Sequence, residues 1–126
     1  MLPFSAWQGR PVLVNLWASW CPACIEELPA LQALEASWVP RGLVLVGVAV
    51  GDPAEHVAAA VRDRGLSWPQ ALDDSERARR TFDTDELPTS LLYAPDGTLL
   101  LKQVGALRVD DPAVQAALLR AVSAAP

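Results

Sequence analysis

The chain has 126 residues, a length that predicts a single domain over residues 1–126 with one hydrophobic core. Apolar residues make up 52% of it, which favours a folded globule over a disordered chain. The formal net charge of −5 argues against nucleic acid or an anionic membrane surface as a partner. The first residues lack the pattern of a signal peptide, and no run approaches the ~20 apolar residues of a membrane helix.

The first predicted elements are a strand and a helix that meet at the two cysteines of the chain. Val12–Trp17 is rich in β-branched and apolar residues, which is typical of a strand buried on both faces. Apolar residues at helical spacing then predict a helix over about Pro22–Trp38, and Pro22 suits its first turn. Cys21 and Cys24 therefore lie at the start of this helix, and their spacing allows a disulfide.

This position indicates redox chemistry. A thiolate at the start of a helix faces free backbone N–H groups and the positive end of the helix dipole, which lower the pKa of a cysteine. We expect Cys21 to be the exposed nucleophile. Cys24 lies one turn further in, and we expect it to be the more shielded thiol that resolves a mixed disulfide.

Glu27 is expected to share the buried face of the same helix. At about 100° per residue it lies within roughly 60° of Cys24, whereas Glu26 points nearly the opposite way, into solvent. Burial should raise the pKa of the Glu27 carboxyl, which could then take or supply the proton of Cys24. Pro29 must disturb the helical register, and a half-buried, hydrogen-bonded acid without a proton role is the alternative.

The rest of the chain alternates strands with helices. A break at residues 40–42 ends the first helix, and Asp52 is expected to cap the second, with Pro53 in its first turn. Residues 73–75 should cap a short helix, and a turn at 94–97 predicts a closing hairpin. The expected elements are the strand Leu43–Val50, a helix ending near Gly65, the strand Trp68–Leu72, the helix Glu76–Phe82, the strands Thr89–Tyr93 and Thr98–Val104, and a last helix from Asp110–Pro112 with Val114, Leu118 and Val122 on one stripe.

These segments, in this order, resemble the thioredoxin superfamily, and more closely its exported thiol-disulfide oxidoreductases of the TlpA/ResA and cytochrome c maturation type. The resemblance spans nearly the whole chain. It rests on a strand leading into Trp20–Cys24, the helix proline Pro29, Leu87-Pro88-Thr89, Asp96-Gly97 and Val104–Ala106. A lone CxxC is a weak signal, but this combination is a strong one.

Two positions specify the branch that the chain resembles. Ordinary thioredoxins carry a buried aspartate six residues before the first cysteine, and Asn15, which cannot titrate, stands there in this chain. The TlpA/ResA type carries a glutamate six residues after that cysteine, the place that Glu27 occupies. The resemblance therefore implies the same proton role for Glu27 as the helical spacing.

The resemblance implies an α/β thioredoxin fold, a central mixed sheet flanked by helices, with an αβ insertion and a shortened N-terminus. We predict helices on both faces. The peptide bond before Pro88 should be cis, and the backbone of Leu87 should be free to pair with an extended substrate. Trp20, Pro22, Leu87 and Pro88 would then form the docking surface for partners. The predicted strand order is the strand at Pro69, then those at Leu43, Val12, Thr89 and Thr98.

The implied function is exchange of the Cys21/Cys24 pair with protein thiols and disulfides, as a reductant of exported proteins. Apocytochrome c and a membrane electron donor are the implied partners. The resemblance implies a monomer that needs no metal and no cofactor beyond this cysteine pair. It places the protein in the periplasm or on the outer face of the cell membrane, with no anchor or signal in this chain; a cytoplasmic location is the alternative.

Other functions stay open at this stage. A general disulfide oxidant would use the same two cysteines. A copper or zinc carrier would bind its metal through Cys21, Cys24 and His56, although no motif surrounds His56. An inert structural disulfide is a further alternative.

Overall fold

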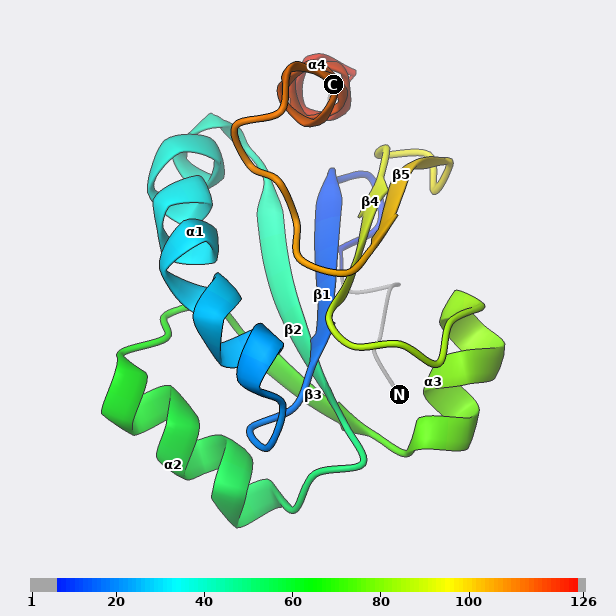
Figure 1. The fold of residues 1–126 in the computed structure, drawn as a ribbon. Helices are drawn as coiled ribbons and strands as arrows, with labels where there is room; N and C mark the ends of the chain where they lie inside the picture. The colour runs from blue at the N-terminus through cyan, green and yellow to red at the C-terminus, as the bar shows by residue number, and fades with distance from the viewer. Residues whose placement is uncertain (1–6, 125–126) are drawn as a thin grey trace.

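A computed structural model describes residues 7–124, which form a mixed sheet covered by helices (Figure 1). Its five strands have the order β3-β2-β1-β4-β5, as predicted. The elements are β1 (Val12–Trp17), α1 (Pro22–Trp38), the short 3₁₀ helix η2 (Val39–Arg41), β2 (Val44–Val50), α2 (Ala54–Arg64), β3 (Gln70–Asp73), α3 (Ser75–Phe82), β4 (Thr89–Tyr93), β5 (Leu99–Val104) and α4 (Pro112–Ser123).

The sheet has its most apolar strands at its centre. β1 and β2 are buried along their whole length, as their continuous runs of valine and leucine predict for strands covered on both faces. β1 pairs in parallel with β2 and antiparallel with β4. Parallel neighbours need a long crossover, so α1 runs back along the sheet from the end of β1. The helix therefore starts where β1 ends. The pair α2 and β3 is the predicted αβ insertion, and it adds an edge strand beside β2.

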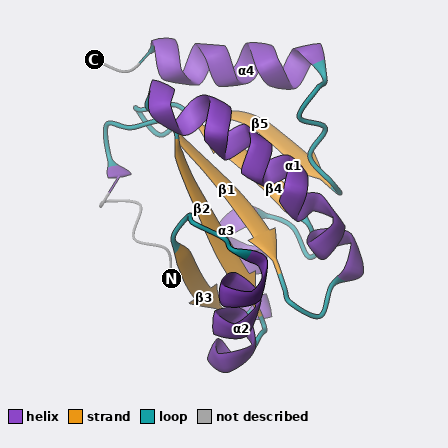
Figure 2. Cartoon of the chain, turned by 90° about the vertical axis from the view of Figure 1, so that its left-hand side faces the viewer, coloured by secondary structure: helices purple, strands orange, loops and turns teal. Residues whose placement is uncertain are grey.

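Helices cover both faces of the sheet, as Figures 1 and 2 show. The core on one face joins Leu13 of β1 to Leu31 of α1 and Leu118 of α4, and it also includes residues of α2. The core on the other face joins Val14 of β1 to Phe82 of α3. Neighbouring side chains of β1 thus belong to different cores, because successive residues of a strand point to opposite faces.

Helix α1 runs for 17 residues and continues through Pro29. Pro29 lies on its exposed side, away from the sheet. The expected disturbance of the register at Pro29 is therefore wrong, and the predicted buried face holds along the whole helix. Its buried residues are Cys24, Glu27, Leu28, Leu31, Leu34 and Trp38.

The predicted cap of α2 is wrong. Pro53, not Asp52, is the N-cap residue of this helix, and no side chain caps it. The Asp52 carboxylate instead accepts hydrogen bonds from Ser19, which lies in the loop after β1. The reason is the parallel pairing of β1 and β2, whose ends lie side by side and bring the two loops together.

Two further details differ from the prediction. β3 begins at Gln70 and not at Trp68, because Trp68 packs into the core and Pro69 has no N–H to donate. The carbonyl of Pro69 still accepts a hydrogen bond from the backbone N–H of Gly47 at 2.9 Å. In α4, Val122 is only half-buried, because the buried stripe follows the spacing i, i+3, i+4, i+7 and excludes i+8. That stripe consists of Val114, Ala117, Leu118 and Ala121.

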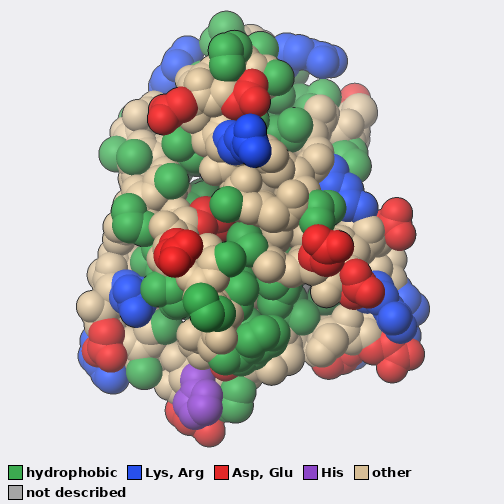
Figure 3. All heavy atoms as spheres, viewed as in Figure 1, with side chains coloured by type: hydrophobic (Ala, Val, Ile, Leu, Met, Phe, Trp, Pro, Cys, Tyr) green, Lys and Arg blue, Asp and Glu red, His purple; other side chains and the backbone are tan. Residues whose placement is uncertain are grey.

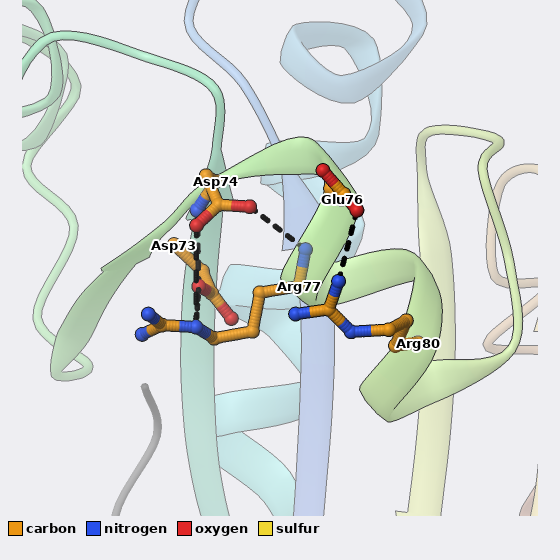
Figure 4. Close-up of polar contacts among 5 residues, drawn as sticks. All are labelled: Asp73, Asp74, Glu76, Arg77 and Arg80. Atoms are coloured by element: carbon orange, nitrogen blue, oxygen red, sulfur yellow. Dashed lines mark hydrogen bonds and ion pairs between the residues drawn. The ribbon is translucent and has the colours of Figure 1, made fainter.

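Charged residues hold the start of α3, as Figure 4 shows. Asp74 is the N-cap residue and accepts a hydrogen bond from the backbone N–H of Arg77 at 2.8 Å, which lowers the pKa of its carboxyl. The Nε of Arg77 lies 3.7 Å from Oδ1 of Asp73, and Arg80 pairs with Glu76 at 3.0 Å. The predicted capping by residues 73–75 is thus confirmed at Asp74, where a negative charge complements the helix dipole.

Candidate active site

A disulfide joins Cys21 to Cys24 at the start of α1. Cys21 is the N-cap residue, with an extended backbone, and Pro22 is the first residue of the helix. The backbone N–H of Cys24 donates a hydrogen bond to Sγ of Cys21 at 3.3 Å. The sulfur of Cys21 therefore faces the free N–H groups and the positive dipole end of α1.

Cys21 is less exposed than predicted. Its exposed fraction is 6%, against 1% for Cys24. The prediction that Cys21 is exposed is therefore wrong for the disulfide form, whereas the prediction that Cys24 is the more shielded of the two is confirmed. The carbonyl oxygen of Leu87 lies 3.9 Å from Sγ of Cys21 and covers it. Cys21 also lines a cavity of about 370 Å³, together with Trp20, Asp85 and Leu87.

The segment Leu87-Pro88 lies against the disulfide. The peptide bond between these two residues is cis, Pro88 is buried and Leu87 is half-buried. Gly105, just after β5, donates a backbone hydrogen bond to the carbonyl of Pro88 at 2.8 Å. Because β4 starts at Thr89 and pairs antiparallel with β1, its first residues lie beside the last residues of β1. This pairing brings Leu87 to Cys21 across 66 positions of the chain.

The predicted docking residues surround Cys21 in part. Trp20 is 62% exposed and Pro22 is exposed, whereas Pro88 lies beneath the surface. Hydrophobic side chains gather over the start of α1 and the neighbouring loop before β4, with acidic side chains on both sides (Figure 3). Trp20, Pro22 and Leu87 therefore provide the surface beside the disulfide, and Pro88 supports it from below.

Glu27 is buried one turn after Cys24, with an exposed fraction of 4%. Its Oε1 accepts a hydrogen bond from Nδ2 of Asn15 at 2.8 Å, and its Oε2 accepts one from the backbone N–H of Leu107 at 2.5 Å. Nδ2 of Asn15 also donates to Oγ of Ser90 at 3.2 Å. Burial raises the pKa of the Glu27 carboxyl, and the hydrogen bonds from Leu107 and Asn15 oppose part of that rise.

Two partners of this network were not predicted. Leu107 contributes a backbone N–H, which no pattern of side chains announces. Ser90 lies opposite Asn15 on the neighbouring strand. The sequence did hold a signal for Ser90, because it is a polar residue inside the apolar strand Thr89–Tyr93. A buried polar group needs a hydrogen-bond partner, so a partner for Ser90 could have been expected.

His56 lies in α2, where its Nδ1 is 3.9 Å from Oδ1 of Asp52 and its side chain is 63% exposed. Within residues 7–124, no group of three or more His, Cys, Asp or Glu side chains is arranged to hold a metal ion. Over the same residues, no helix combines the length and the apolar character needed to cross a membrane.

The strand order, the disulfide at the start of α1 and the proline segment beside it define a thioredoxin-superfamily protein, and the ResA relatives described below support the TlpA/ResA type, as predicted. The family model described as AhpC/TSA matches residues 2–102, and the chain belongs to this family.

Individual relatives agree with this assignment. The chain is 28% identical over 98 residues to the thiol-disulfide oxidoreductase ResA of Bacillus thuringiensis (strain Al Hakam), a match that covers 78% of this chain and 57% of that relative. The chain thus spans little more than half the length of the curated relative. A crystal structure of a thiol:disulfide interchange protein from Chlorobium tepidum TLS has 28% identity and a TM-score of 0.75, covering 90% of this chain and 83% of that one. A thiol-disulfide isomerase from Corynebacterium glutamicum, at 18% identity, shares the fold with a TM-score of 0.82, covering 98% and 87% of the two chains.

Proposed function

We propose that this protein is a thiol-disulfide oxidoreductase that reduces disulfides of exported proteins through Cys21 and Cys24. One observation carries the proposal: the two cysteines form a disulfide at the amino end of α1, beside Leu87 and one turn before the buried carboxyl of Glu27. The relatives named above as oxidoreductases and interchange proteins support the same chemistry.

The reaction exchanges two sulfur–sulfur bonds. In the reduced protein, the Cys21 thiolate attacks one sulfur of the partner's disulfide, which forms a mixed disulfide and releases the partner's other cysteine as a thiolate. Cys24 then loses its proton and attacks Sγ of Cys21. This step re-forms the Cys21–Cys24 bond and releases the partner's second thiolate. Two electrons pass to the partner, and a membrane-bound dithiol donor would return them.

Two parts of the site serve this sequence of steps. The helix start stabilises a Cys21 thiolate, because the N–H of Cys24 already points at Sγ and the dipole of α1 adds a positive potential. Glu27 takes the proton from Cys24. Burial raises the pKa of Glu27 and so brings it closer to that of a thiol, which favours proton transfer between the two groups.

The surface beside Cys21 fits an extended protein segment. The half-buried Leu87 offers backbone groups for strand-like pairing with the partner. The neighbouring cavity is lined by Leu16, Val50, Ala78 and Trp20, among others, and can take an apolar side chain next to the partner's cysteine. A CxxC-bearing segment of an apocytochrome c is the substrate that we propose.

The remaining parts of the proposal rest on the resemblance to exported oxidoreductases. We propose that residues 1–126 form one thioredoxin-like domain that acts as a monomer, with the cysteine pair as its only redox group. We also propose that it works outside the cytoplasm, in the periplasm or on the outer face of the cell membrane.

A redox titration and a trapping experiment test the function. A reduction potential near that of thioredoxin, about −270 mV, supports a reductant, whereas one near −120 mV would make the protein an oxidant instead. Cys24→Ser should trap a mixed disulfide with an oxidised CxxC peptide, because the resolving thiol is missing. Cys21→Ser should trap none. Wild-type protein that fails to reduce insulin would contradict the proposal.

The role of Glu27 has a matched test. Glu27→Gln keeps the size and shape of the side chain but cannot take a proton, so we expect insulin reduction to slow by about tenfold or more. Glu26→Gln makes the same change on the exposed side of α1 and should leave the rate unchanged. Equal rates for the two variants would remove the proton role from Glu27.

A further inference from the structure

We propose that Asp52 is a positioning residue for the reactive cysteine, acting through Ser19; this inference rests on the function proposed above. Asp52 follows β2, and Ser19 lies in the loop between β1 and Cys21. The backbone N–H of Ser19 donates to Oδ2 of Asp52 at 2.7 Å, and Oγ of Ser19 donates to Oδ1 at 3.0 Å. Both oxygens of one carboxylate therefore hold a single residue of the active-site loop.

The sheet explains why these two residues meet. β1 and β2 are parallel, and their pairing ends with Trp17 opposite Ala49. The segments that follow β1 and β2 then leave the sheet side by side. The contact between Ser19 and Asp52 thus joins the two segments just beyond the last backbone pairing of the strands. Hydrogen bonds to a charged acceptor are stronger than those between neutral groups, so this contact can hold the loop.

The hydrogen bonds from Ser19 are the main interactions of the Asp52 side chain. Its side chain is 0% exposed, and a buried carboxylate is unfavourable unless hydrogen bonds satisfy it. It does not cap α2, whose N-cap residue is Pro53. The Nδ1 of His56 lies 3.9 Å away, but this side chain is 63% exposed and solvent screens its charge. The two hydrogen bonds from Ser19 therefore dominate what Asp52 does.

The contact reaches the reacting sulfur through a short, constrained loop. A single residue, Trp20, separates Ser19 from Cys21 in the sequence, and the backbone N–H of Cys21 donates to the carbonyl of Ala18 at 3.2 Å. Between these anchors Trp20 points outward, 62% exposed, and lines the same cavity as Cys21 and Leu87. Without Asp52, the loop could shift and move Sγ of Cys21 away from the N–H groups of α1.

Three variants test this role. Asp52→Ala removes both acceptors. Asp52→Asn keeps the geometry without the charge, because its Oδ1 can accept from the N–H of Ser19 while its Nδ2 donates to Oγ. Asp111→Ala is the matched control: it removes a carboxylate that accepts a backbone N–H, from Ala113 at 2.8 Å, at the start of the distant helix α4 (Figure 1).

The measurement is the rate of Cys21 alkylation by iodoacetamide against pH in the reduced protein, together with insulin reduction. We expect Asp52→Ala to move the alkylation profile to higher pH and to slow insulin reduction about tenfold, since misplacing a reacting group by a fraction of an ångström has effects of this order. Asp111→Ala should match the wild type, and Asp52→Asn, whose neutral hydrogen bonds are weaker, should lie between the wild type and Asp52→Ala.

Other results would overturn the proposal. An equal shift to lower pH in Asp52→Ala and Asp52→Asn would mean that Asp52 acts through its charge. Unchanged profiles would mean that it does not position Cys21. If Asp52→Ala fails to fold, Ser19→Ala replaces it: this variant loses only the Oγ hydrogen bond, and a smaller shift to higher pH is expected. Wild-type protein that reduces no insulin contradicts the proposed function alone, because the alkylation profile still tests Asp52.

Discussion

Glu27 shows how one residue can connect folding stability to redox chemistry. The carboxyl is buried, and both of its oxygens accept hydrogen bonds, from Asn15 and from Leu107. Those bonds favour the ionised form, whereas burial favours the protonated form and is the larger effect. The raised pKa is therefore a property of the folded chain.

The raised pKa predicts how Glu27 changes stability with pH. The folded-state pKa lies above the ordinary value of 4.5, so the contribution of the carboxyl is complete below that value and is lost as pH rises through the folded-state pKa. The unfolding free energy of the wild type minus that of Glu27→Gln should thus fall as pH rises above 4.5 and through the folded-state pKa of Glu27.

Urea unfolding of the disulfide form at several pH values measures this difference, since neither cysteine titrates there. The exposed Glu26→Gln is the control, and its difference from the wild type should change little with pH. A difference for Glu27→Gln that grew with pH would show that the hydrogen bonds, not burial, govern this carboxyl.

At the scale of elements, one row of residues crosses the sheet beneath α1. Asn15 of β1 lies opposite Gly47 of β2 and Ser90 of β4, and Gly47 lies opposite Gln70 of β3. A Cβ atom at position 47 would overlap the side chain of Gln70. Gln70 is held there because its Oε1 accepts a hydrogen bond from Nε1 of Trp17 at 2.8 Å. The glycine thus makes room for a polar side chain over the sheet.

This packing predicts the outcome of a double-mutant cycle. Gly47→Ala should destabilise the fold by about 1–3 kcal/mol, because Gln70 must give up its bond to Trp17 or clash with the new methyl group. Gln70→Ala removes the clash, so the double variant should be more stable than the sum of the single changes predicts. Denaturant unfolding of the four proteins measures the coupling. Additive effects would show that the two side chains do not compete for space.

At the scale of the whole molecule, the charge balance acts on any partner that approaches. The chain carries a net charge of −5, and acidic side chains flank the apolar surface at the start of α1 (Figure 3). Asp85 also lines the cavity beside Cys21. An acidic surface of this kind attracts basic partners and repels acidic ones.

The charge predicts a salt dependence of the exchange reaction. Reduction of a basic protein disulfide should slow several-fold as salt rises from about 0.01 M to about 0.5 M, because the Debye length shortens from about 30 Å to below 8 Å. An uncharged small disulfide, such as hydroxyethyl disulfide, is the control and should react at nearly the same rate throughout. Equal salt dependence for the two substrates would mean that the protein's charge does not steer its partners.

Local patterns in the sequence by themselves determined the elements and much of the site. The apolar run Val12–Trp17 predicted a strand buried on both faces, and helical spacing placed Glu27 on the inner face of α1 with Cys24. Both predictions succeed because periodicity reports which side of an element is buried. The family resemblance supplied the strand order and the proline segment, which no local pattern contains.

Only the tertiary structure decided which distant groups meet. It paired Asp52 with Ser19 instead of with α2, supplied the N–H of Leu107 to Glu27, and covered Cys21 with the carbonyl of Leu87. These contacts depend on strand register and on the paths of loops, and all three use a backbone group, which no side-chain pattern announces. A sequence pattern therefore specifies the faces of each element, whereas the partners across those faces follow from how the elements are assembled.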